Sequence, residues 1–65
     1  MRKKLKRIAF ILATEGGKTS AEKFLAMSAD LTSEQRVAMA VEIASNLNDH
    51  SELIFRKALL AEVQS

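Results

Sequence analysis

The chain has 65 residues, no cysteine, one histidine and a hydrophobic content of 48%. This composition excludes disulfides, disfavours a zinc site within one chain and argues against disorder. A single domain this short buries only about 60% of its unfolded surface when it folds alone, so we expect self-association to add stability.

The net charge of +2 is unevenly distributed. Half of the ten basic residues lie within residues 1–7, whereas residues 8–65 carry five basic and eight acidic residues, a net charge of −3. A basic head on a mildly acidic body predicts a polyanionic partner.

The first predicted helix runs from about Arg2 to Thr14. On a helical wheel, Leu5, Ile8 and Leu12 fall on one side, while Lys3, Lys6, Arg7 and Phe10 fall on the other. We interpret this second side as a face that binds phosphates, with Phe10 available to stack on a base or to act as a wedge. The proposed nucleic-acid-binding set is Arg2, Lys3, Lys4, Lys6, Arg7 and Phe10.

Two other interpretations of this helix stay open. The basic residues could simply solubilise the terminus, with Phe10 buried by another helix or subunit, or the helix could lie on anionic lipid. The apolar stripe is short for lipid binding. The apolar run Ile8–Ala13 is also shorter than the roughly 7–15 residues of a signal sequence core or the about 20 of a membrane span. We therefore expect a cytoplasmic protein without a membrane partner.

A glycine pair and two capping patterns predict where the next two helices begin. Gly16-Gly17 is the only glycine pair in a chain without proline, and it predicts the end of the first helix. Thr19 and Glu22 have capping-box spacing, which predicts a helix over residues 20–29. Thr32 and Gln35 repeat that spacing, so a third helix should begin at Ser33, after a short hairpin loop.

The sequence leaves two possibilities for the C-terminal half. Residues 46–51 are rich in cap formers, and Ser51 could cap a fourth helix from Glu52 to Gln64. The alternative is one helix from Ser33 to Gln64. Small and apolar residues keep a 3–4 spacing through the segment, which favours the continuous helix. We assign this stripe as the oligomer interface: Val37, Ala40, Ala44, Leu47, Ile54, Ala58 and Ala61.

Three further motifs are better explained structurally. The stretch from Thr19 to Val41 could form a helix-turn-helix with base-contacting side chains at its second helix, but helical hairpins without DNA are commoner. Gly16-Gly17-Lys18-Thr19 matches the end of a phosphate-binding P-loop but has no preceding strand or upstream glycine. His50 has no recognisable catalytic partner, so we interpret it as a solvent-facing or interface residue.

The segment Leu47–Arg56 is similar to part of the second helix of Rop-type plasmid copy-number regulators, and Glu34-Gln35 after Asp30 resembles their turn region. That resemblance implies a helical hairpin that dimerises into a four-helix bundle and binds paired RNA loops. The first half departs from the family pattern because it contains the Gly16-Gly17 break. The family's RNA contacts lie in its first helix, so no binding residue is transferred.

These observations predict an all-α fold of three or four helices with a long C-terminal helix, forming a small bundle completed by homo-oligomerisation, most simply a homodimer. We expect a cytoplasmic regulatory protein, without enzymatic activity, cofactor or metal, that binds DNA or RNA through its basic first helix. The alternative is a protein–protein adaptor or inhibitor that uses an apolar helical groove.

Overall fold

The computed structural model describes residues 3–64, with side chains through Glu62, and this range folds entirely into helices and connecting turns. The four helices are α1 (Lys3–Ala13), α2 (Gly17–Ser28), α3 (Ser33–Ser45) and α4 (Asp49–Gln64). The all-α prediction is confirmed. Within the described range, no helix is long and apolar enough to cross a membrane.

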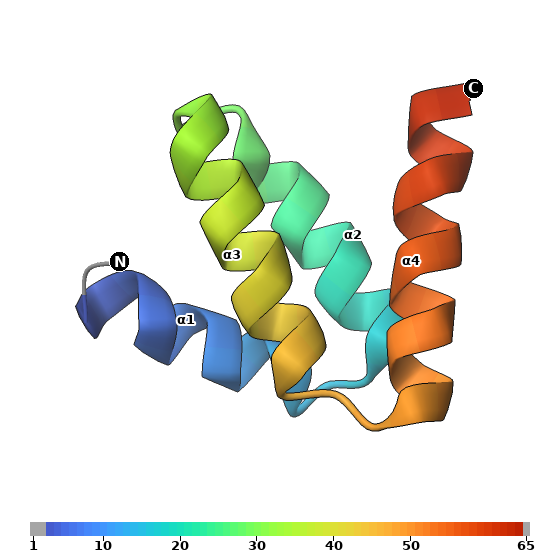
Figure 1. Cartoon of the computed structure of the whole chain (residues 1–65). Helices are drawn as coiled ribbons and strands as arrows, with labels where there is room; N and C mark the ends of the chain where they lie inside the picture. Colours follow the sequence, from blue (N-terminus) through green and yellow to red (C-terminus); the bar gives the residue numbers. More distant parts are fainter. Residues whose placement is uncertain (1–2, 65) are drawn as a thin grey trace.

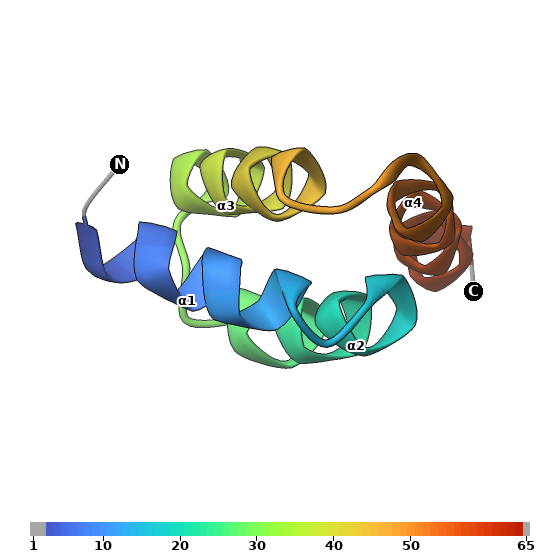
Figure 2. The same ribbon diagram turned by 90° about the horizontal axis from the view of Figure 1, so that it is seen from below.

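The helices pack mainly in two pairs, α1 against α3 and α2 against α4 (Figure 1). Figure 2 shows α3 on one side of the molecule and α1 and α2 on the other, with α4 at one end. In both views the beginning of α1 and helix α4 lie at opposite ends of the molecule. The basic residues are thereby held far from the C-terminal helix.

Each helix contributes to one small core. Phe24 of α2 and Phe55 of α4 form its aromatic part, with ring centroids 6.2 Å apart and planes inclined by 53°. Tilted aromatic pairs at this separation gain stability beyond that of buried area alone. The remaining buried apolar residues are Ala9, Leu12, Ala13, Ala21, Met39 and Ile43.

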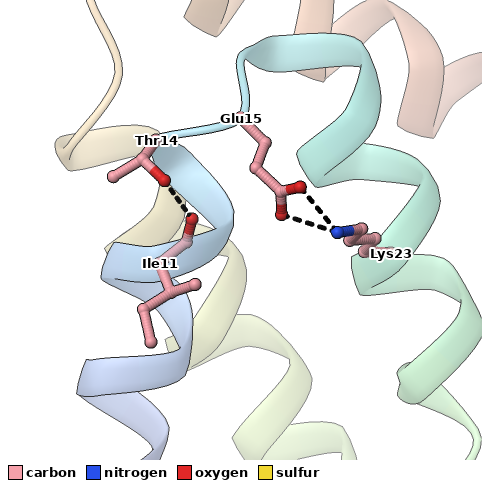
Figure 3. Close-up of polar contacts among 4 residues, drawn as sticks. All are labelled: Ile11, Thr14, Glu15 and Lys23. Atoms are coloured by element: carbon pink, nitrogen blue, oxygen red, sulfur yellow. Dashed lines mark hydrogen bonds and ion pairs between the residues drawn. The ribbon is translucent and has the colours of Figure 1, made fainter.

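The predicted glycine break is confirmed at Gly16, whose φ of 89° is a conformation that favours glycine. The end of α1 is closed by hydrogen bonds from the Thr14 hydroxyl to the Ile11 carbonyl (2.6 Å; Figure 3) and from the Gly16 N–H to the Ala13 carbonyl (3.3 Å). The next helix then begins at once, at Gly17.

The predicted capping box at Thr19 is wrong. Helix α2 begins two residues earlier than Thr19, and its N-cap Gly16 makes no side-chain capping bond. The turn at Gly16 lets the chain resume helical geometry immediately, so Thr19 lies inside the first turn. The buried Ser20 hydroxyl donates instead to the Gly17 carbonyl (3.1 Å).

The capping box that begins α3 is confirmed. The Gln35 N–H donates to the Thr32 hydroxyl (3.1 Å), and the Thr32 N–H donates to the Gln35 side-chain carbonyl (2.9 Å). The Arg36 Nε adds a bond of 2.8 Å to the Ser28 carbonyl at the end of α2. These contacts fix the turn between α2 and α3.

The predicted continuous helix over residues 33–64 is wrong. Helix α3 ends at Ser45 and α4 begins at Asp49. Asn46 donates through Nδ2 to the Glu42 carbonyl (2.9 Å), and Asn48 Oδ1 accepts the Ser51 N–H (2.8 Å). Two asparagines thus satisfy backbone groups at both helix ends, which a 3–4 apolar spacing does not reveal. The cap of the C-terminal helix is Asn48, not Ser51.

Candidate nucleic-acid interface

The basic face of α1 is built by the way this helix packs on α3. Leu5, Ala9 and Leu12 face the core, and Ala9 is completely buried. Because successive residues turn by about 100°, the opposite face presents the cations to solvent. The described cations on this face, all exposed, are Lys3, Lys4, Lys6 and Arg7.

These four cations have no ion-pair partner within residues 3–64, in contrast to two other cations of the chain. Lys23 contacts both carboxylate oxygens of Glu15 at 2.6 and 2.8 Å (Figure 3), and Arg56 binds Glu52 at 2.9 Å. Ion pairs within the described residues therefore do not neutralise the four charges of α1. Unpaired charges of one sign on one helix face attract a polyanion.

The cations are closely spaced along the helix. Residues 3–7 span about 6 Å of axis at about 1.5 Å per residue. Lys3, Lys4 and Arg7 border a shallow hollow in the surface. The long side chains of this short basic segment can therefore reach neighbouring phosphates of one strand. The predicted site residue Arg2 lies outside the described residues.

Phe10 lies on this same exposed face. Its side chain is 58% exposed, and the next residue, Ile11, is 53% exposed. The alternative in which a neighbouring helix of the same chain buries Phe10 is therefore wrong for the described residues. An aromatic ring and four cations share one surface, which we name the α1 basic face (Lys3, Lys4, Lys6, Arg7 and Phe10).

The predicted oligomer interface is not one continuous stripe, because the break after Ser45 places its members on two helices. Val37 and Ala61 are exposed and Ile54 is 36% exposed. The others lie partly buried against the core: Ala40, Ala44, Leu47 and Ala58.

A different set of exposed apolar side chains lies on α3 and α4. Val37 and Val41 on α3 are 66% and 63% exposed, and Leu53 and Leu60 on α4 are at least half exposed. Val41 borders one surface hollow and Leu53 borders another. Glu52 and other residues of α4 line both hollows. We name this set (Val37, Val41, Leu53 and Leu60) the α3–α4 apolar surface. Helical wheels drawn separately for the two helices would have found it.

The helix-turn-helix interpretation is weakened by the turn itself. Three of its potential base-contacting side chains, Thr32, Gln35 and Arg36, make hydrogen bonds within the chain. They stabilise the connection between α2 and α3 and are not free to reach a base edge. His50 is exposed, and no group of acidic or histidine side chains suited to a metal ion occurs among the described residues.

Comparison with family models, with curated proteins and with solved structures gave no match for this chain. The resemblance of Leu47–Arg56 to Rop-type regulators gains no support from these comparisons. Function is therefore argued from the surfaces described above.

Proposed function

We propose that this protein is a small non-enzymatic regulatory protein that binds nucleic acid through the α1 basic face. The observation that carries the proposal is the set of four exposed cations without ion-pair partners in the described chain. Phosphate contacts by such side chains supply most of the affinity in sequence-independent binding to nucleic acid. Phe10 adds an exposed ring where a base can be reached.

We further propose that the protein acts as a homo-oligomer through the α3–α4 apolar surface. The exposed valine and leucine side chains on α3 and α4 support this proposal, because exposed apolar patches on small proteins often mark association surfaces. Because α4 and the beginning of α1 lie at opposite ends, association through α4 leaves the basic residues accessible (Figure 1).

A matched pair of double variants tests the nucleic-acid proposal. Lys3→Gln with Arg7→Gln removes two charges from the α1 basic face, whereas Lys18→Gln with Lys57→Gln removes two exposed charges elsewhere. Binding of a labelled mixed-sequence oligonucleotide is measured by fluorescence anisotropy at 50 mM salt. We expect the first pair to weaken binding by roughly tenfold or more and the second to change it much less.

Equal weakening by the two pairs would show that binding follows net charge, and the assignment to α1 would be wrong. Unchanged binding by the α1 pair would refute it directly. Circular dichroism of all variants checks that helicity is retained, which we expect because every substituted side chain is exposed.

A second candidate function is that of a protein–protein adaptor or inhibitor. The observation that favours it is the hollow between α3 and α4, which Val41 and Leu47 line together with Glu52 and Arg56. A partner held there by apolar contacts would remain bound at high salt and would be released by Val41→Asp. Nucleic acid held by α1 would be released at high salt and would stay bound to the Val41→Asp variant.

A further inference from the structure

Around the α1 axis, Phe10 lies between Lys6 and Lys3, and along the axis it lies about 4.5 Å beyond Arg7. At about 100° per residue, its side chain lies within about 60° of those of Lys3, Lys6 and Arg7. It also points away from the core-facing side of α1, where Leu12 is buried. A ligand that extends along these cations toward the end of α1 can therefore also contact the ring.

The chemistry of this face favours base faces over base edges. Between Lys3 and Ile11 the exposed side chains include no amide or hydroxyl group, so apart from the guanine contacts open to Lys and Arg the face has few groups that read base edges, whereas it does present an aromatic ring. The nearest hydroxyl, that of Thr14, donates to the Ile11 carbonyl at 2.6 Å (Figure 3). A stacked duplex presents base edges in its grooves, whereas a single strand also presents the flat faces on which an aromatic ring stacks.

From this geometry we infer that the α1 basic face prefers single-stranded nucleic acid, with Phe10 stacked on a base and the flanking Lys3, Lys6 and Arg7 on the phosphates. The inference rests on the proposed function and specifies its ligand. The same contacts accept DNA or RNA, because every base offers a flat face.

Two substitutions separate stacking from the insertion of a wedge into a duplex. Leucine, isoleucine and methionine can serve as wedges between base pairs, but only an aromatic side chain stacks. Phe10→Trp should therefore preserve binding to a single strand, and Phe10→Leu should weaken it. Ile11→Ala is the matched control, because Ile11 is apolar, almost as exposed as Phe10 and close to Arg7 around the helix, but carries no aromatic ring.

The experiment measures anisotropy with three labelled probes at 50 mM salt: a 16-nucleotide mixed-sequence DNA strand, its duplex with the complementary strand, and the RNA strand of the same sequence. We expect tighter binding to either single strand than to the duplex. Phe10→Leu should weaken single-strand binding by roughly 5- to 150-fold, and Phe10→Trp and Ile11→Ala should stay close to the unmodified protein.

The outcomes distinguish this inference from the proposed function. Equal affinity for the strands and the duplex, or Phe10→Leu without effect on strand binding, would overturn the single-strand inference while leaving nucleic-acid binding intact. Binding to none of the three probes would overturn both. A difference between the DNA and RNA strands would identify which of the two the protein prefers and would still support the inference.

Discussion

Replacing Gly17 by alanine tests the contact that joins α2 to α4. A Cβ added at Gly17 would overlap the Ser51 carbonyl oxygen and lie 3.1 Å from the Ile54 Cβ. Because the overlapped atom belongs to the backbone, it cannot move away by a side-chain rotation. Forcing an extra carbon into such a contact costs about 1–3 kcal/mol, which exceeds the gain of at most about 1 kcal/mol from the better helix propensity of alanine.

In a domain of this size, about 1 kcal/mol changes the melting temperature by about 4–8 °C. We therefore expect Gly17→Ala to lower it by up to about 16 °C, as followed by the helical signal in circular dichroism. Lys18→Ala is the control in the same helical turn, and because Lys18 is exposed it should change stability by less than about 0.5 kcal/mol. A Gly17→Ala protein as stable as the Lys18→Ala protein would refute the close approach of α2 and α4.

Two further substitutions test the cap of α4 and the aromatic core. Asn48→Ala should lose about 1 kcal/mol of unfolding free energy, because Asn48 accepts the Ser51 N–H, whereas Ser51→Ala should change it little; urea unfolding compares them, and the reverse order would show that Ser51 is the cap. Phe55→Ala should cost about 3–5 kcal/mol, because Phe55 is buried to 2% exposure, and the exposed Phe10→Ala should cost far less. Equal unfolding midpoints for the two phenylalanine variants would contradict the assigned core.

Short-range signals in the sequence predicted much of the fold. The Gly16-Gly17 break and the Thr32–Gln35 capping box are both present, because each depends only on residues within one turn. The capping box predicted at Thr19 is absent because the same residue types at this spacing can also lie inside a helix that has already begun. A capping pattern states where a helix can begin, not where it must.

The break between α3 and α4 could not be settled from the apolar pattern. Ala44 near the end of α3 and Leu47 just after it keep their 3–4 spacing, and both pack against the core although the helix ends between them. The outcome depends on Asn46, which ends one helix, and Asn48, which caps the next, through hydrogen bonds to groups four and three residues away along the chain. The spacing of apolar residues indicates which residues are buried, but it carries little information about whether the helix continues through them.

The basic residues of α1 were predictable from composition, but their freedom from ion pairs was not. The sequence contains eight acidic residues, any of which could have folded back onto α1. In the structure Glu15 and Glu52 are occupied by Lys23 and Arg56 instead. The exposure of Phe10 likewise depended on tertiary packing, since a phenylalanine is usually buried.

The salt dependence of binding tests the central claim most directly. Lys3, Lys6 and Arg7 on phosphates predict that the logarithm of the single-strand association constant falls with slope about −2.1 against the logarithm of salt concentration. Affinity for the DNA strand should then drop by about 20-fold between 50 and 200 mM salt. A slope near zero would contradict the account, because the α1 basic face would not be holding phosphates.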